Sequence, residues 1–184
     1  MKSYEIVYLA GGCFWCTEAI FSSIKGVGNV IPGYMGGSKS SPTYQEVCQG
    51  TTNHAEVVEI NFDPRKTQLT DILFIFFNTH NPTTLNRQGN DIGTQYRSAI
   101  FYTSQEQKKI ANQVLKQLDE EKIFESPIVT EVTKSQTFYP AETNHHKFFN
   151  NNPENSYCQY IIKPKLDRLR EYFTAYLKKS ARVN

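Results

Sequence analysis

The 184-residue sequence has no long hydrophobic run and no excess of charge of one sign. Its longest apolar stretches, such as 72–77, are far shorter than the ~18 residues that a membrane-spanning helix needs. Lys and Arg together number 20 against 18 for Asp and Glu, so the formal net charge is +2, and the charges are scattered. These absences exclude a membrane-spanning protein and leave no electrostatic case for binding nucleic acid or an anionic membrane surface.

Cysteine is also scarce, and no secretory signal is visible. The first residues, 1–5, are not followed by an apolar segment that ends at a small-residue cleavage site. Four cysteines in a chain of this length are too few for a disulfide framework. We therefore expect a cytoplasmic protein whose thiols are reduced and available for chemistry.

No internal repeat, low-complexity tract or linker divides the chain, and its length suits one hydrophobic core. We expect one domain over 1–184, with a frayed, lysine-rich end at 178–184. The spacing of apolar residues predicts strands at 5–10, 54–63, 96–102 and 128–132, helices at 13–24, 69–77, 104–118 and 165–178, and long loops at 30–50 and 80–95. This order of elements predicts a mixed α/β or α+β sandwich rather than a doubly wound sheet.

Cys13 follows the glycine pair Gly11-Gly12 and opens the first predicted helix. Backbone N–H groups and the helix dipole favour negative charge there, so we expect a lowered thiol pKa and a nucleophilic Cys13. The alternative is a buried, inert cysteine, but a glycine pair before a cysteine is suited to exposing it. Cys16 lies three residues further on the same helix face, where a disulfide with Cys13 is sterically plausible.

The remaining cysteines and the histidines show no metal-binding pattern. A zinc site built on Cys13 and Cys16 needs two more ligands, and the other candidates lack the usual paired spacing. These candidates are Cys48, His54, His80, His145, His146 and Cys158. We therefore expect no metal. We expect Cys48 to be a small buried residue, whereas the polar, proline-flanked stretch around Cys158 favours exposure of that thiol.

Glu56 shares one face of its predicted strand with Val58, Ile60 and Phe62, and that face meets the core. Loss of water raises the pKa of a carboxyl group, and a carboxyl that stays partly protonated near neutral pH can donate a proton. The alternative is a residue near the strand end whose side chain escapes to solvent.

Three polar residues border the two long loops, and two aromatic residues follow Cys13. Tyr44, Asp91 and Tyr96 together can supply hydrogen-bonding groups to a shared pocket, although each taken singly is more typical of a structural role. Phe14 and Trp15 form either an apolar wall beside Cys13 or part of the core.

The tetrapeptide 12–15 resembles the signature of A-type peptide-methionine sulfoxide reductases. Further segments resemble that family in the same order: 33–37, 42–44, 47–48, 54–58, 86–89, 93–98, 138–139, 152–153 and 157–158. The resemblance spans almost the whole chain. It implies an α+β fold: a two-layer sandwich with a mixed sheet and a ferredoxin-like core.

The resemblance also implies a function, the thiol-dependent reduction of the S epimer of methionine sulfoxide, free or in proteins. Cys13 would attack the sulfoxide sulfur and Glu56 would protonate the oxygen. A second cysteine would convert the sulfenic acid of Cys13 to a disulfide, which thioredoxin would reduce. The residues implied to hold the oxygen are Tyr44, Asp91 and Tyr96, and those implied to bind the rest of the substrate are Phe14, Trp15 and Tyr157. The expected partners are thioredoxin and oxidised proteins or free methionine sulfoxide; no cofactor is expected, and the chain is expected to be a monomer.

The chain departs from the family pattern at three positions. Cys16 and Asn53 stand where glycine is usual, and Asn81 stands where aspartate is usual. Cys16 leaves two candidates for the resolving thiol. Cys158 matches the family position and is expected to form the first disulfide with Cys13, whereas Cys16 has the higher effective concentration.

Two other functions remain open. A general thiol–disulfide oxidoreductase that uses Cys13 and Cys16 explains the pair of thiols but gives Glu56 no role. A non-catalytic module whose aromatic pocket binds methionine-rich peptides predicts binding without turnover.

Overall fold

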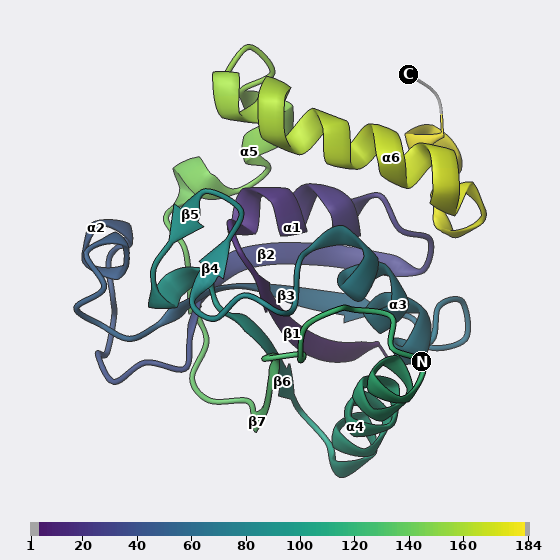
Figure 1. Ribbon diagram of the computed structural model, residues 1–184. Coiled ribbons are helices and arrows are strands. Elements are labelled where there is room, and N and C mark those ends of the chain that lie inside the picture. The colour runs from purple at the N-terminus through teal and green to yellow at the C-terminus, as the bar shows by residue number, and fades with distance from the viewer. Residues whose placement is uncertain (1–3, 183–184) are drawn as a thin grey trace.

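The computed structural model describes residues 4–182. Its main sheet has six strands in the order β7-β6-β1-β3-β2-β8, and a separate ribbon pairs β4 with β5 (Figure 1). The strands are β1 (Glu5–Gly11), β2 (Val27–Met35), β3 (Ala55–Phe62), β4 (Arg87–Gln88), β5 (Asp91–Ile92), β6 (Ser98–Tyr102), β7 (Glu131–Lys134) and β8 (Tyr139–Pro140). The helices are α1 (Phe14–Ser22), α2 (Tyr44–Cys48), α3 (Leu69–Thr79), α4 (Gln105–Glu120), α5 (Phe148–Asn151) and α6 (Lys163–Phe173).

The four central strands form a ferredoxin-like core. β6, β1, β3 and β2 are neighbours in that order and each pair is antiparallel, with α1 between β1 and β2 and α3 between β3 and β6. β7 adds to β6 in parallel, which makes the sheet mixed. The expected α+β fold with a mixed sheet is therefore confirmed.

The helices gather on one face of the sheet, which gives the fold its two layers. Leu9 of β1 and Val58 and Ile60 of β3 are fully buried and share one apolar cluster with side chains of α1, α3 and α6. In Figure 1, α6 lies along the side of α1 that faces away from the sheet. A smaller cluster, which includes Val57 and Phe101, covers the opposite face. This packing holds the start of α1 against β1 and β3.

Most predicted elements are confirmed, with small differences at their ends. The strand expected at 128–132 begins only at Glu131, and the helix expected at 165–178 ends at Phe173. The expectation of a frayed end is wrong for 178–182, because Lys178 N donates a hydrogen bond to the Ser23 carbonyl oxygen at 2.9 Å. Residues 183–184 lie outside the described residues. No helix within 4–182 has the length and apolar character to cross a membrane.

The prediction of a loop at 30–50 is wrong in two places, because β2 extends to Met35 and α2 occupies Tyr44–Cys48. The sequence does not indicate this strand because it contains Pro32 and Gly33, which are unfavourable within strands. The Pro32 carbonyl oxygen nevertheless accepts a hydrogen bond from Ala141 N at 2.8 Å, beside the β8 pairing. Glycine is required at position 33, because a Cβ there would overlap the carbonyl oxygen of Tyr139.

Candidate active site

Cys13 lies at the junction between β1 and α1. Gly12 turns the chain with a φ of +90°, and a Cβ at this position would overlap the side chain of Gln88, so only glycine fits. Cys13 is the N-cap residue of α1, and its carbonyl oxygen accepts hydrogen bonds from Cys16 N at 3.1 Å and Thr17 N at 3.4 Å. The predicted helix start is confirmed, although Cys13 is only 9% exposed.

Glu56 reaches the same helix start from β3. Its side chain is 1% exposed, so the alternative of a carboxyl group in solvent is wrong. Glu56 Oε2 accepts a hydrogen bond from the backbone N–H of Phe14, the residue next to Cys13, at 2.9 Å. Burial raises the pKa of Glu56 to about 8 and outweighs the Phe14 hydrogen bond, and negative charge on Asp91 and Cys16 adds to the rise. The carboxyl group therefore holds a proton near neutral pH.

The two thiols at the start of α1 differ in acidity. Burial raises the pKa of Cys13 well above its ordinary value, and Cys16 and Glu56 raise it further, whereas the backbone N–H of Trp15 lowers it by less. The lowered pKa expected for Cys13 is therefore wrong, because burial outweighs the helix N–H groups. A hydrogen bond from Cys13 lowers the pKa of Cys16 to about 7, against the effect of burial, and Lys165 lowers it as well.

Three predicted polar residues lie within electrostatic range of Glu56. Tyr44 begins α2, Asp91 belongs to β5, and Tyr96 ends a short 3-10 turn. Burial raises the pKa of both tyrosines and negative charge on Glu56 raises it further, so both hydroxyls keep their protons and remain donors. Asp91 Oδ2 accepts a hydrogen bond from the Tyr157 hydroxyl at 2.8 Å. The structure therefore brings the predicted pocket residues together.

Trp15 is the centre of an aromatic group. Its ring stacks on Phe148, with centroids 3.7 Å apart and planes inclined by 5°, and meets the Tyr157 ring edge-on at 5.8 Å. Trp15 Nε1 donates a hydrogen bond to His145 Nδ1 at 3.0 Å. Phe14 is almost fully buried and belongs to the core, whereas Trp15 and Tyr157 are half-buried. Of the two alternatives for this pair, packing in the core applies to Phe14, and an apolar wall beside Cys13 applies to Trp15.

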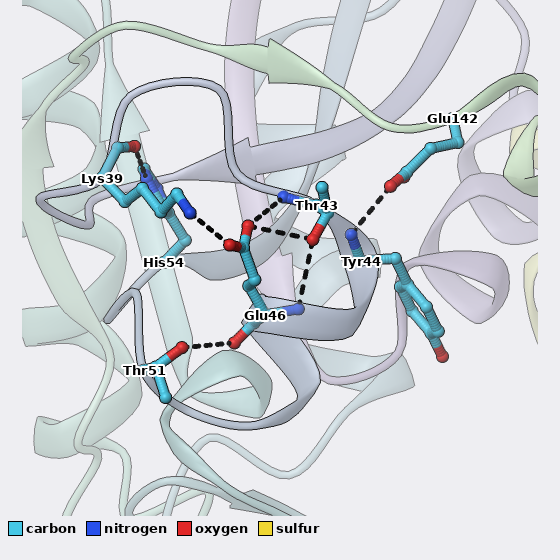
Figure 2. A network of polar contacts seen from close by, with 7 residues as sticks. All are labelled: Lys39, Thr43, Tyr44, Glu46, Thr51, His54 and Glu142. Atoms are coloured by element: carbon cyan, nitrogen blue, oxygen red, sulfur yellow. Dashed lines mark hydrogen bonds and ion pairs between the residues drawn. The ribbon is translucent and has the colours of Figure 1, made fainter.

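The segment 142–148 also lies at the site, although no sequence pattern predicts its contacts there. Both carboxylate oxygens of Glu142 accept hydrogen bonds at 2.8 Å: Oε1 from the backbone N–H of Tyr44, and Oε2 from the hydroxyl of Tyr34 (Figure 2 shows the first). His145 and Phe148, the partners of Trp15, follow in the same segment. Glu142 lies 98 residues from Tyr44 and 108 from Tyr34. No periodicity signals contacts over such separations.

The two other cysteines lie in environments opposite to those expected. Cys158 is fully buried rather than exposed, because 158–162 wind into a π-helical turn that directs Cys158 and Ile162 into the core. Burial raises the pKa of Cys158, and negative charge on Cys16 raises it further. Cys48 is exposed rather than buried, because Val47 is the α2 residue that faces the core. All four cysteines are free thiols.

The described part of the chain contains no group of three or more His, Cys, Asp or Glu side chains arranged to hold a metal ion. At Asn53, where the sequence departs from the family glycine, φ is +57°. Asparagine tolerates this left-handed conformation better than most other residues with side chains, so Asn53 can occupy a position where glycine is usual.

The fold and this site define a thiol-dependent oxidoreductase: two thiols and a protonated carboxyl group meet at one helix start above a ferredoxin-like core. The model of the family "Peptide methionine sulfoxide reductase" matches residues 5–177. Peptide methionine sulfoxide reductase MsrA of Trichodesmium erythraeum is 52% identical over 169 residues, which cover 92% of this chain and 96% of the relative. The chain belongs to the peptide methionine sulfoxide reductase family.

Solved structures share this fold. Mxr1 from Saccharomyces cerevisiae in its reduced form superimposes with a TM-score of 0.76 and 32% identity, covering 84% of this chain and 89% of Mxr1. Mxr1 in complex with Trx2 has the same fold with a TM-score of 0.54 and 21% identity, covering 79% of this chain and 84% of that chain.

Proposed function

We propose that this chain reduces the S epimer of methionine sulfoxide, free or within proteins, to methionine, with Cys13 as the nucleophile and Glu56 as the proton donor. The hydrogen bond from Phe14 N to Glu56 carries this proposal, because it holds a protonated carboxyl group at the residue next to a buried thiol. General acid catalysis needs this proximity of donor and nucleophile.

In the proposed reaction, the sulfur of Cys13 attacks the sulfoxide sulfur while Glu56 transfers its proton to the sulfoxide oxygen. This attack forms a bond between the two sulfur atoms. That bond and the sulfur–oxygen bond of the substrate then break as the hydroxyl group passes to the Cys13 sulfur, so methionine leaves and Cys13 becomes a sulfenic acid. The Cys13 sulfur supplies both electrons, and the thiol proton replaces the one that Glu56 gave up. The partial positive charge on a bound sulfoxide sulfur favours the Cys13 thiolate and so opposes the effect of burial.

The surrounding residues are proposed to orient the substrate. Tyr44 and Tyr96 would donate hydrogen bonds to the sulfoxide oxygen, which is consistent with hydroxyls that stay protonated. Asp91 would hold Tyr157 through the hydrogen bond between them. Trp15 is proposed to receive the methyl group, with Tyr157 beside it, whereas the buried Phe14 supports the site from the core.

We propose that Cys16 resolves the sulfenic acid first by forming a disulfide with Cys13. Cys158 then attacks Cys16 in a thiol–disulfide exchange, which forms a Cys16–Cys158 disulfide and frees Cys13. The hydrogen bond between Cys13 and Cys16 and the pKa of Cys16 of about 7 support the first step, since a nearby thiolate attacks fastest. Attack on the sulfenic sulfur forms the Cys13–Cys16 disulfide and releases water. The charge of Cys16 raises the pKa of Cys158, so the two thiols act on each other electrostatically, which supports the second step. The order expected from the family resemblance, with Cys158 first, is the alternative.

Thioredoxin is the proposed reductant of the resulting disulfide. Mxr1, which is 32% identical to this chain over the matched region, has been solved in complex with Trx2. A monomeric state and a cytoplasmic location stay predictions.

The test is the release of methionine from the separated S and R epimers of dabsyl-methionine sulfoxide, coupled to NADPH consumption through thioredoxin and its reductase. We expect turnover of the S epimer alone and none with Cys13→Ser. Reduction of insulin at a comparable rate would instead favour a general thiol–disulfide oxidoreductase, and binding of the sulfoxide without turnover would favour a binding module.

A further inference from the structure

Glu142 joins two segments of the site through both of its carboxylate oxygens. Oε1 accepts the backbone N–H of Tyr44 and Oε2 accepts the hydroxyl of Tyr34, each at 2.8 Å. Figure 2 shows Glu142 approaching the start of α2 while the Tyr44 ring extends away from it. Burial acts against it, but the hydrogen bonds from the backbone and from Tyr34 hold the pKa of Glu142 below its ordinary value. Glu142 is therefore a carboxylate at neutral pH.

The start of α2 relies on Glu142 for one of its backbone donors. Thr43 and Glu46 form a capping box: Thr43 Oγ1 accepts from Glu46 N at 3.4 Å, and Glu46 Oε2 accepts from Thr43 N at 3.0 Å (Figure 2). This box leaves the N–H of Tyr44 without a partner inside the helix. α2 has five residues and so little stability of its own. The contact with Glu142 therefore fixes the position of Tyr44.

The same segment also touches the Tyr44 ring and the neighbourhood of Glu56. His145, three residues after Glu142, packs against Tyr44 with ring centroids 4.3 Å apart. Tyr34 is paired with Glu56 in the register of β2 and β3 and is 1% exposed. Glu142 thus contacts the backbone of one proposed oxygen-binding residue and the strand neighbour of the proposed acid.

We propose that Glu142 is a positioning residue, which acts through the backbone N–H of Tyr44 to place the Tyr44 hydroxyl against the sulfoxide oxygen. This inference rests on the proposed function of the site. Each oxygen of Glu142 is already engaged by a donor of the fold, so the carboxylate holds other groups in place and does not exchange a proton with substrate.

Two substitutions separate the geometry from the charge. Glu142→Ala removes both acceptors, and we expect a roughly tenfold loss of the single-turnover rate because Tyr44 is no longer held. In Glu142→Gln the side-chain carbonyl accepts from Tyr44 N and the NH₂ group donates to the Tyr34 hydroxyl, which turns to accept, so most of the rate returns. Glu171→Ala, which removes an exposed carboxylate from α6, is the matched control and leaves the rate unchanged.

A double-mutant cycle with Tyr44→Phe is the decisive measurement. Single-turnover release of methionine is compared among wild type, Glu142→Ala, Tyr44→Phe and the double variant. If Glu142 works by placing the Tyr44 hydroxyl, Glu142→Ala costs roughly tenfold when that hydroxyl is present and less than about twofold when it is absent. Equal losses in the two backgrounds overturn the proposal, as does a wild-type rate in Glu142→Ala or in Tyr44→Phe.

Two further checks keep the result unambiguous. Thermal unfolding is measured for every variant, and if Glu142→Ala does not fold, Glu142→Asp takes its place in the cycle, because the shorter carboxylate cannot span both donors. Failure of the proposed function is visible separately, since wild type itself would then release no methionine.

Discussion

The active site joins two regions that hold their residues by different means. In the first, which we call the frame (β1, β3 and the start of α1), burial and a backbone hydrogen bond fix Cys13 and Glu56. In the second, which we call the rim (the Trp15 side chain, α2, β5 and segments 142–148 and 157–158), side chains hold one another, as Phe148 does with Trp15. Burial raises the pKa of both frame residues, Cys13 and Glu56, whereas rim residues supply shape and hydrogen bonds. Substitutions in the frame should therefore affect the chemical step most, and those in the rim should act more weakly.

The largest expected effect is that of Cys13→Ser in the frame. Turnover should fall to background, because a hydroxyl group does not ionise near neutral pH and an oxygen nucleophile cannot form the reducible intermediate. Serine is a favoured N-cap residue, so the fold should persist, which circular dichroism checks. More than a trace of sulfoxide reduction would remove Cys13 from the proposed role.

Glu56→Gln comes next, with an expected loss of about 10² to 10⁴ in the single-turnover rate, as for removal of a general acid. The wild-type rate should fall as pH rises through about 8, where the carboxyl group loses its proton. The variant should lack this descending limb. Equal rates for the two proteins at pH 7 would exclude Glu56 as the proton donor.

Glu56→Gln should lower the reaction rate but raise the stability of the folded protein relative to wild type at high pH. The pKa of Glu56 rises from 4.5 to about 8 on folding, so between these pH values the folded chain binds a proton that the unfolded chain lacks. Stability contributed by this group is complete below 4.5 and falls as pH rises towards 8, by roughly 3 kcal/mol at pH 7. Urea unfolding of wild type and Glu56→Gln at pH 5 and pH 8 should show the variant gaining relative stability at the higher pH. If the difference in the free energy of unfolding between the two proteins did not change with pH, Glu56 would not have a raised pKa in the folded protein.

The two candidate resolving thiols lie one in each region, Cys16 in the frame and Cys158 in the rim, and substituting each tests the proposed order of disulfide formation. With Cys16→Ser, one equivalent of methionine should be released and the thioredoxin-coupled rate should fall roughly tenfold or more, because the nearby thiolate is lost. Cys158→Ser should still form the Cys13–Cys16 disulfide and recycle with a smaller loss. Peptide mass spectrometry after alkylation identifies the bridge. A Cys13–Cys158 bridge in the wild type as the first product would reverse the proposed order.

The smallest expected effect belongs to the rim. Phe148→Leu removes the stacked ring under Trp15 but keeps an apolar side chain, so KM should rise roughly three- to tenfold with kcat little changed. Steady-state kinetics at saturating thioredoxin separates the two constants. A loss confined to kcat would mean that the rim acts on the chemical step and that its distinction from the frame fails.

The frame could be predicted from the sequence because its signals are local. The glycine pair before Cys13 and the alternation of Val58, Ile60 and Phe62 behind Glu56 are each contained within about ten residues, and periodicity reports such patterns well. The pKa of Cys13 could not be predicted in this way. It depends on how deeply the finished fold buries the helix start, which helix position alone does not reveal.

The sequence indicates Tyr44 and Asp91 as pocket residues, but the contacts that hold the rest of the rim cannot be predicted from it, for a physical reason. The partners of Glu142 lie about a hundred residues away, so no short-range pattern records them. The burial of Cys158 depends on a π-helical turn, whose five-residue spacing of hydrogen bonds matches neither helical nor strand periodicity. β2 was missed because Pro32 and Gly33, which normally interrupt strands, are accommodated here by contacts with β8.

The stacking of Trp15 on Phe148 has a spectroscopic consequence. Trp15 is the single tryptophan of the sequence, so the whole indole emission of the protein originates at the rim, one residue from Cys16. Its indole N–H is bonded to His145, which makes the emission sensitive to protonation of that imidazole as well as to movement of the stacked ring. The chain therefore carries an intrinsic optical reporter, and stopped-flow fluorescence can follow sulfoxide binding and disulfide formation without an added label.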